Sequence, residues 1–469
     1  MKNLLLFDSL SRKKKLFVPL KPGKVSMYIC GPTVYDYPHI GNLRAYVFAD
    51  TLRRVLALNT YKVNQVMNIT DVGHLTSNAD EGEDKVELRA AQTKKSAWEI
   101  AEFYAKEFQN DLKCLNIQEP TIWCKATDHI KEQIELIKKL EKKGYTYRIA
   151  DGMYFDTSKF PRYGELTRLK QQKLRAGARV AFISDKRNIH DFALWKFSPL
   201  GNRRQMEWKS PWGIGFPGWH IECSAMAMRY LGSTLDIHTG GIDHIPIHHT
   251  NEIAQSEAVT GKAFVRYWLH CAFLSVEGQK MSKSIGNVLT IKDLLSRGYE
   301  PLSFRYLLLT AHYRSPMNFT WKALDSAAKA LHSLREYAQE FAINNKKDNF
   351  TITKEAVAKI INNDLDTPRL IAKLWNILKN KESFQNKRAF VAQTDKILGL
   401  GILEATPCRK PGKIPVEIKV LVKKRDVLRK SKKWQEADKI RKEILQWGYV
   451  VKDTPLGTHL RKLSELHFT

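Results

Sequence analysis

Four residues that can bind a metal ion stand in three separate parts of the chain. They are Cys30, Cys223, and the pair His248 and Glu252, which are four residues apart. That spacing places the imidazole and the carboxylate on one face of a helix, and thiolates from two distant strands or loops would complete a tetrahedral zinc site. His220 precedes Cys223 by three residues, so a pairing of these two is an alternative that spacing does not exclude. Each residue taken alone is more often structural.

Two short motifs could bind the phosphates of a nucleotide. In HIGN, residues 39–42, a glycine at a helix start lets the backbone approach a nucleotide, and the histidine can donate to phosphate oxygens. In KMSKSIGN, residues 280–287, Lys280 and Lys283 place two ammonium groups about one helical turn apart. Two such cations suit the negative charge that grows when an α-phosphate is substituted. Either motif alone is weak, but chance rarely produces both.

A strand, a tight turn and a helix are predicted around the first motif. Residues 25–30 form a short apolar run before a Gly-Pro turn, and after residue 42 apolar side chains recur at helical spacing, with Asn42 placed to cap the helix. Such a unit opens a doubly wound parallel sheet. Five of the fourteen histidines fall between His220 and His249, so we expect the site chemistry there.

The rest of the pattern predicts an insertion followed by helices. A helix face over residues 130–140 ends at Gly144, and short strand-like pieces follow to about residue 199. Beyond residue 323 the apolar periodicity is helical, with a proline-bounded linker at 407–415 before a final helix pair. The predicted fold class is therefore α/β, a doubly wound parallel sheet with an inserted domain and an all-α C-terminal region.

The charge balance indicates a polyanionic partner. Among 469 residues, 77 Lys and Arg stand against 49 Asp and Glu, which gives a net charge of +28. A generally basic proteome would give the same number, but the segment 419–442 concentrates eleven basic residues against three acids on the predicted helix pair. The six cysteines are sparse and no long apolar run or signal peptide is present, so we expect a cytoplasmic protein that does not bind membranes.

The two motifs resemble the HIGH and KMSKS signatures of class I aminoacyl-tRNA synthetases. Strings spread over essentially the whole chain are further similar to the cysteinyl-tRNA synthetase family of bacterial type. They are CGPTVYD from residue 30, NITD from 68, ATDH from 126, DFALWK from 191, GWHIECSAM from 218, GGID from 240, HHTNEIAQS from 248 and DTPLGT from 453. The resemblance implies a Rossmann-type catalytic fold.

The resemblance also implies roles for individual residues. It assigns one zinc ion per chain to Cys30, Cys223, His248 and Glu252, which leaves His220 as a supporting residue. It assigns contacts with the amino acid to Cys30, Thr33 and Trp219, catalysis and ATP binding to His39, Asn42, Lys280 and Lys283, and further ATP contacts to Gly241 and Asp243. Two positions depart from the usual strings. Asn42 replaces the second histidine of HIGH, and Thr250 changes the usual HHENE string, at a position that is no proposed ligand.

The implied reaction joins L-cysteine to tRNA(Cys) with ATP and Mg²⁺. Zinc would bind the substrate thiolate, which explains the rejection of serine, because an apolar pocket discriminates such a near isostere by only about a hundredfold. The implied domains are two halves of the catalytic domain at 1–115 and 206–265, a connective insertion at 116–205, a stem-contact region with the KMSKS loop at 266–324, a helical bundle at 325–405 and an anticodon-binding domain at 410–469. We expect a monomer.

Three alternatives remain at this point. A cysteine ligase of mycothiol biosynthesis shares the zinc pocket but lacks an anticodon module, and the basic C-terminal third argues against it. An inactive paralogue could serve as a tRNA-binding or zinc-dependent regulator, but His39, Lys280 and Lys283 are intact. A methionyl enzyme shares the signature pair but not this set of metal-binding residues.

Overall fold

The computed structural model describes most of the chain. The described residues are 3–73, 84–168, 185–199, 204–281, 286–341, 350–380, 383–403, 415–431, 433–454 and 457–462. The prediction for Lys283 falls outside them.

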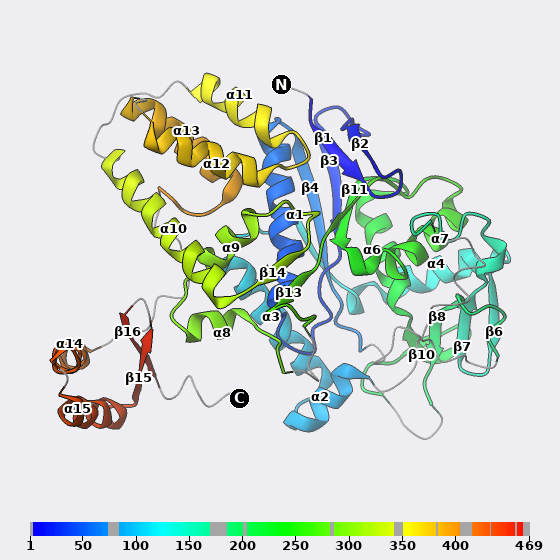
Figure 1. The fold of residues 1–469 in the computed structure, drawn as a ribbon. Helices are drawn as coiled ribbons and strands as arrows, with labels where there is room; N and C mark the ends of the chain where they lie inside the picture. Colours follow the sequence, from blue (N-terminus) through cyan, green and yellow to red (C-terminus); the bar gives the residue numbers. More distant parts are fainter. Residues whose placement is uncertain are drawn as a thin grey trace.

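A five-stranded parallel sheet forms the centre of the molecule (Figure 1). Its strands are β3 (Lys24–Ile29), β4 (Lys62–Ile69), β5 (Ile122–Lys125), β11 (Leu235–Gly241) and β12 (Val265–Cys271). They lie in the order β12-β11-β3-β4-β5, so the strand order reverses between β3 and β11. In doubly wound sheets the carboxyl ends of the strands open a crevice at this switch point. Cys30 follows β3 directly and therefore lies at that crevice.

Helices cover both faces of this sheet. They are α1 (Ile40–Leu58), α3 (Ala97–Cys114), α4 (Ile130–Lys142), α6 (Trp219–Leu231) and α7 (His248–Thr260), and the short helix α2 (Lys85–Thr93) packs on α3. Figure 1 shows α1 on one side of the sheet and α6 with α7 on the other. Each side has its own apolar core: Val47 and Leu52 of α1 belong to one, and Ile221 of α6 and Ala254 of α7 belong to the other.

Two smaller sheets flank the central one. A hairpin of β1 (Leu5–Asp8) and β2 (Lys13–Leu16) begins the chain. Between the halves of the parallel sheet an antiparallel sheet is inserted, as the strand-like pieces predict. Its strands are β6 (Thr146–Ile149), β7 (Gly152–Phe155), β8 (Phe192–Phe197), β9 (Trp208–Ser210) and β10 (Gly213–Pro217), in the order β6-β7-β8-β10-β9.

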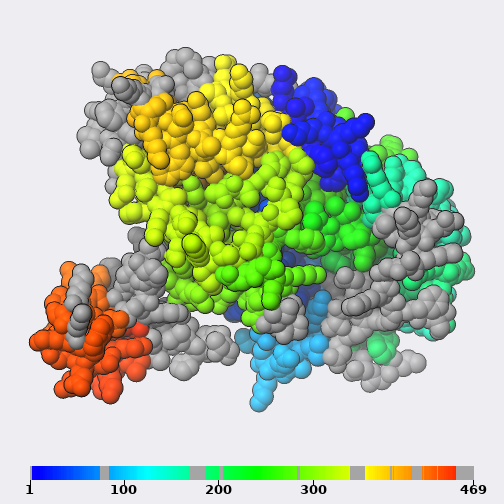
Figure 2. Space-filling view, viewed as in Figure 1, coloured from blue at the N-terminus to red at the C-terminus, as the bar shows by residue number. Residues whose placement is uncertain are grey.

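The C-terminal part is mainly helical. A parallel pair, β13 (Leu274–Val276) and β14 (Met317–Phe319), encloses α8 (Ile291–Ser296) and α9 (Pro301–Leu309) in the chain. The helices that follow are α10 (Trp321–Phe341), α11 (Phe350–Ile361), α12 (Thr367–Lys379), α13 (Phe384–Leu398), α14 (Val416–Lys430) and α15 (Trp434–Gln446). The chain then adds a hairpin, β15 (Tyr449–Thr454) and β16 (Gly457–Lys462), which the sequence patterns do not predict. The segment from α14 to β16 has its own small core, including Ile418 and Ile444, and forms a lobe at the side of the molecule (Figure 2).

A buried ion pair ties α1 to the C-terminal helices. The Asp50 carboxylate of α1 lies 2.5 Å from the Arg305 guanidinium of α9, and the side chains of both are fully buried. Arg54 also contacts Asp50, at 2.8 Å, and the Nε of Arg305 donates to the carbonyl of Leu398 at the end of α13. Three helices from distant parts of the sequence are thus fixed to one another.

The expected α/β architecture is confirmed, but the C-terminal region is not all-α, because it ends in the hairpin β15–β16. Two local predictions also differ. Asn42 is not the N-cap residue of α1, because His39 occupies that position and Asn42 is the third residue of the first turn. Cys223 lies on helix α6 and not on a strand or loop. No helix among the described residues is long and apolar enough to cross a membrane.

Candidate functional site

The four predicted metal ligands come together in one buried cluster. The Cys30 Sγ lies 4.0 Å from the Cys223 Sγ and 3.8 Å from Oε1 of Glu252, and the same carboxylate oxygen lies 3.0 Å from Nε2 of His248. His248 also hydrogen-bonds Cys223. All four residues are buried. One end of β3 and two helices, α6 and α7, supply these side chains.

Each ligand position follows from a local feature of the fold. Cys30 is the first residue after β3, where the strand leaves the sheet at the switch point. His248 and Glu252 occupy the first and fifth positions of α7, so the predicted helical spacing is confirmed. Cys223 lies one turn after the start of α6, whose inward face is fully buried. The cluster therefore lies where helix starts and a strand end converge.

Charge within the cluster is balanced by histidines. Burial alone would raise the pKa of Glu252, but the charges and hydrogen bonds of His238 and His248 outweigh it and lower that pKa. His238 Nε2 lies 3.1 Å from Oε2 of Glu252, on the side away from His248. Burial disfavours the charged form of His248, but Glu252 and Cys223 raise its pKa to about 10. The carboxylate is thus held ionised by two imidazoles.

The two thiols differ in their surroundings. A hydrogen bond from Cys30 lowers the pKa of Cys223 to about 6, against the opposing effect of burial and with help from His248. Burial raises the pKa of Cys30, and the neighbouring Cys223 and Glu252 raise it further. Neither cysteine is in a disulfide. The two sulfur atoms lie at van der Waals distance, and the Cys223 thiol loses its proton more readily than the Cys30 thiol.

A fifth donor, His249, also reaches the cluster. Its Nε2 lies 3.5 Å from the Cys30 Sγ, and donor atoms of Cys30, His248, His249 and Glu252 all fall within 4.8 Å of one another. On its other side, Nδ1 of His249 lies 2.7 Å from Nε2 of His270. The sequence patterns did not single out His249, although it adjoins His248 in the HHTNE string. The one signal that could have found it is the concentration of histidines.

Aromatic and polar residues surround this cluster. Trp219 begins α6, is half-buried, and its ring centroid lies 4.5 Å from that of His248. His220 Nδ1 lies 3.0 Å from Nδ1 of His248, so His220 supports the ring from behind and does not face Glu252. Thr33 bridges to Thr70 of the next strand's continuation, three residues beyond Cys30. Trp219 and Thr33 thus lie on the chain segments that carry Cys223 and Cys30.

The HIGN segment forms the start of α1. Nδ1 of His39 accepts from the Asn42 backbone N–H at 3.1 Å, and Oδ1 of Asn42 accepts from the His39 backbone N–H at 3.2 Å. This reciprocal capping box fixes both side chains at the positive end of a helix. The amide of Ile40 donates to the carbonyl of Leu289, just after the KMSKSIGN motif. Asn42 therefore has a structural role that its sequence position did not reveal.

The start of the KMSKSIGN motif touches HIGN. A Cβ at Gly41 would clash with the methyl carbon of Met281, so the absence of a side chain at Gly41 lets the Met281 side chain lie against the helix start. Lys280 precedes Met281 and is exposed, and its carbonyl accepts from the Asn287 side chain at 3.1 Å. The structure thus brings Met281 of the KMSKSIGN motif against Gly41 of HIGN.

The remaining predicted nucleotide contacts lie at the end of β11. Gly241 ends this strand, and a Cβ there would meet Oδ1 of Asp243 at 2.1 Å. Asp243 lies in the short 3-10 helix Ile242–His244, which leads into α7, and its carboxylate is largely exposed. Both residues thus stand at the same sheet edge as Cys30.

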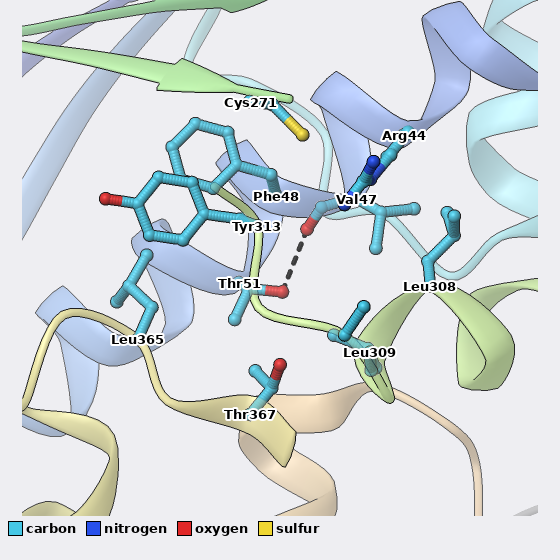
Figure 3. Close-up of a pocket in the computed structure, with 11 residues that line it drawn as sticks. Arg44, Val47, Phe48, Thr51, Cys271, Leu308, Leu309, Tyr313, Leu365 and Thr367 are labelled. Atoms are coloured by element: carbon cyan, nitrogen blue, oxygen red, sulfur yellow. Dashed lines mark hydrogen bonds between the residues drawn. The ribbon is translucent and has the colours of Figure 1, made fainter. Parts of the chain in front are cut away.

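A separate cavity lies on the far side of α1 (Figure 3). Phe48 stacks on Tyr313 at a centroid distance of 4.3 Å, and the Thr51 hydroxyl donates to the Val47 carbonyl at 2.8 Å. Cys271 is the thiol of this cavity, and burial raises its pKa to about 12. None of the predicted site residues lines it, so it is not part of the predicted site.

Comparisons with known proteins agree along the chain. Residues 16–329 match the family model "tRNA synthetases class I (C) catalytic domain", and residues 412–461 match "Cysteinyl-tRNA ligase anticodon binding domain". The chain is 50% identical to the cysteine–tRNA ligase 1 of Burkholderia lata, covering 97% of this chain and 96% of that protein. It is 44% identical to the cysteine–tRNA ligase of Treponema denticola, covering 98% and 100%.

Solved structures share the fold at low identity. The methionyl-tRNA synthetase of Mycobacterium tuberculosis, solved with methionyl-adenylate, has a TM-score of 0.53 at 15% identity, covering 80% of this chain and 90% of that one. The LeuRS of Agrobacterium radiobacter K84 has a TM-score of 0.55 at 12% identity, covering 84% and 86%. These structures show the fold alone, whereas the matched family models and the full-length identities show the family: the chain belongs to the cysteinyl-tRNA synthetase family.

Proposed function

We propose that this protein is a ligase that activates L-cysteine with ATP and transfers it to tRNA(Cys). In the first step a carboxylate oxygen of cysteine bonds to the α-phosphorus of ATP while the bond to pyrophosphate breaks. In the second step a hydroxyl of the terminal adenosine of tRNA takes the acyl group and AMP leaves. The observation that carries the proposal is the buried group Cys30, Cys223, His248 and Glu252. The loop that follows Cys30 leads to the capped HIGN helix start.

The geometry of this group fits a tetrahedral zinc ion. Ligand atoms at zinc-ligand distances of about 2.0 to 2.3 Å are separated by roughly 3.3 to 3.8 Å. The separations of 4.0 Å between Cys30 and Cys223, 3.8 Å between Cys30 and Glu252 and 3.0 Å between His248 and Glu252 bracket these values. Bound there, zinc would supply affinity for the thiolate of substrate cysteine, and serine would lack it.

The residues of this chain have distinct tasks around that ion. His238 holds the second oxygen of Glu252, and His220 holds the far nitrogen of His248, which fixes both side chains for binding. Trp219, packed on His248, walls the pocket and excludes water from it. His249 is the alternative fourth donor, because its Nε2 also faces Cys30.

The nucleotide side depends on positioning and charge. The exposed start of α1 offers backbone N–H groups and the helix dipole to phosphate oxygens, with His39 and Asn42 held there by their capping box. Lys280 and Lys283 would stabilise the departing pyrophosphate, with Mg²⁺ bound to the ATP. Gly241 and Asp243, at the adjacent strand end, would contact the adenylate.

Two further properties follow from the same residues. Cys30 and Cys223 must stay reduced to bind a metal and a second thiol, so we place the protein in the cytoplasm. The lobe from α14 to β16, with its basic helices, would bind the anticodon arm, and a single chain holds all parts of the site, so we infer a monomer.

The first experiment measures cysteine-dependent exchange of pyrophosphate into ATP, tRNA charging with cysteine and serine, and zinc content on one sample. We expect charging with cysteine alone and about one zinc ion per chain. Cys223→Ser should lose zinc and both activities. Cys114→Ser, a buried cysteine at the end of α3, is the matched control and should keep them.

His249→Gln decides between the two donor sets. Retained zinc with this variant supports Cys223 as the fourth ligand, whereas zinc lost with His249→Gln but kept with Cys223→Ser would assign His249 instead. Exchange with cysteine in the absence of charging would favour a ligase for a small acceptor. A fully active protein without zinc would contradict the proposed thiolate recognition.

A further inference from the structure

A partly exposed group of rings and cations stands beside the HIGN helix start. It consists of Tyr37, Phe103, Lys95 and Lys292, and we call it the aromatic platform. The ring centroids of Tyr37 and Phe103 are 6.2 Å apart and nearly perpendicular. The Lys292 ammonium lies 3.8 Å from the centre of the Tyr37 ring, and the Lys95 ammonium lies 5.4 Å from that of Phe103. Phe103 is 40% exposed, although it is a large apolar residue on α3.

The platform is held rigidly from below. Tyr104 is buried and packs edge-on against both Tyr37 and Phe103, at 5.1 Å from each. The Tyr104 hydroxyl accepts hydrogen bonds from the Arg89 guanidinium at 3.0 and 3.1 Å. The ring faces of Tyr37 and Phe103 are therefore fixed in place, while Phe103 contributes little to the core. Rigid, exposed rings with neighbouring cations are the usual means of binding single-stranded nucleic acid.

The platform adjoins the place where acyl transfer must occur. Tyr37 precedes His39, the N-cap of α1, by two residues. Lys292 belongs to α8 and follows Leu289, whose carbonyl accepts from the Ile40 amide at 2.8 Å. The loop before α1 and helix α8 adjoin the start of α1, and helix α3 joins them through the contact of Phe103 with Tyr37.

We propose that the aromatic platform binds the unpaired acceptor end of tRNA, with a base stacked on Phe103. This inference rests on the proposed function, since it names how the second substrate reaches the site. A nucleobase stacks on an aromatic face irrespective of its identity, and ammonium groups compensate the phosphates on either side. The Lys292 ammonium also forms an ion pair with Glu107, at 2.9 Å. The Lys95 ammonium lies over the Phe103 ring, and its flexible side chain can move this charge to a phosphate.

The test compares intact tRNA with tRNA that lacks its unpaired 3′ nucleotides. Phe103→Ala should weaken the binding of intact tRNA about tenfold, within the range for loss of one stacked base, and leave the binding of truncated tRNA unchanged. Phe103→Tyr, which keeps the ring, should bind intact tRNA as the original chain does. Lys95→Gln should weaken intact tRNA severalfold and flatten its dependence on salt.

Two controls separate this inference from folding and from the proposed function. Lys13→Gln changes an exposed lysine of β2, in the N-terminal hairpin, and should leave both tRNA affinities unaltered. Exchange of pyrophosphate with cysteine needs no tRNA, so its retention in Phe103→Ala shows that the adenylate site is intact. Equal losses for intact and truncated tRNA, or no loss for either, would overturn the platform. Absence of exchange and charging in the unaltered chain would instead reject the proposed function.

Discussion

At the scale of single residues, the carboxylate of Glu252 is the centre of the buried site. One oxygen faces His248 and Cys30, and the other is held by His238. His238 orients Glu252, and a residue that orients a metal ligand is expected to matter almost as much as the ligand itself. His238 also stacks on Trp268, with ring centroids 4.7 Å apart, so its ring is fixed independently of Glu252.

His238→Phe tests this arrangement. The substitution keeps the ring stacked on Trp268 but removes the nitrogen beside Glu252, so we expect metal affinity to fall about 10- to 100-fold. Competition against a chromophoric chelator measures it. The control is His332→Phe, at an exposed histidine on α10, which should bind metal as the original chain does. Unchanged affinity in His238→Phe would mean that Glu252 needs no such support.

Asn42 has a capping role in the structure and a proposed role beside the phosphates, and substitution can separate the two. Asn42→Ala removes the acceptor for the His39 amide, and we expect it to cost about 1 kcal/mol of stability, measured by thermal unfolding. Asn42→Glu restores an acceptor at the third helical position, so stability should return. Its negative charge beside the phosphate site should nevertheless depress the rate of pyrophosphate exchange. Recovery of both properties together would show that Asn42 serves the helix alone.

At the scale of elements, the buried contact of Asp50 with Arg305 holds α1 against α9. Burial would raise the pKa of Asp50, but Arg305 and Arg54 outweigh it and lower that pKa. The stabilisation is therefore complete above the pKa of about 3.9 that aspartate has in the unfolded chain. It is lost as the pH falls through the lowered native pKa.

Asp50→Asn should accordingly destabilise the protein at neutral pH by about 3 to 5 kcal/mol, because it leaves Arg305 buried without a counter-charge. Thermal unfolding between pH 3 and pH 8 measures the difference from the original chain, which should be constant above pH 5 and shrink below pH 4. Glu135→Gln, at an exposed carboxylate that pairs with the exposed Lys138, is the control and should shift unfolding little at any pH. A difference that grows at low pH would contradict the assignment.

The elements predicted from the sequence were those with a local signal. The strand before Cys30, the helix after HIGN and the spacing of His248 and Glu252 are confirmed because each depends on periodicity over a few residues. The hairpin β15–β16 was missed, since Pro455 and Gly457 interrupt the apolar alternation there. The helical position of Cys223 was also missed, because α6 is buried nearly all round and lacks an amphipathic pattern.

The site was less predictable from residues alone than from resemblance. Spacing paired His248 with Glu252, but which cysteines join them depends on contacts across about 190 to 220 residues. No local pattern encodes such contacts. The roles of His238 and His249 depend on the direction in which each ring points. The contact between Met281 and Gly41 likewise exists only in the folded chain.

At the scale of the whole molecule, the lobe from α14 to β16 is built on its own core and follows the described end of the helical region at residue 403. A chain ending at residue 403 should therefore retain pyrophosphate exchange with cysteine while its affinity for tRNA falls at least tenfold. Filter binding and initial charging rates measure this loss. Loss of exchange in the shortened chain would show instead that the lobe supports the catalytic half.

The strand order has a consequence for how the protein is made. Strand β3 pairs on one edge with β4, which emerges soon after it, but on the other with β11, about 200 residues later. At typical rates of synthesis that edge waits for about 10 to 40 s on the ribosome. During this interval an unpaired strand and the thiol of Cys30 stand open to other chains and to oxidants. The buried cluster of Cys30, Cys223, His248 and Glu252 is thus complete only when Glu252 has been added, long after Cys30 has left the ribosome.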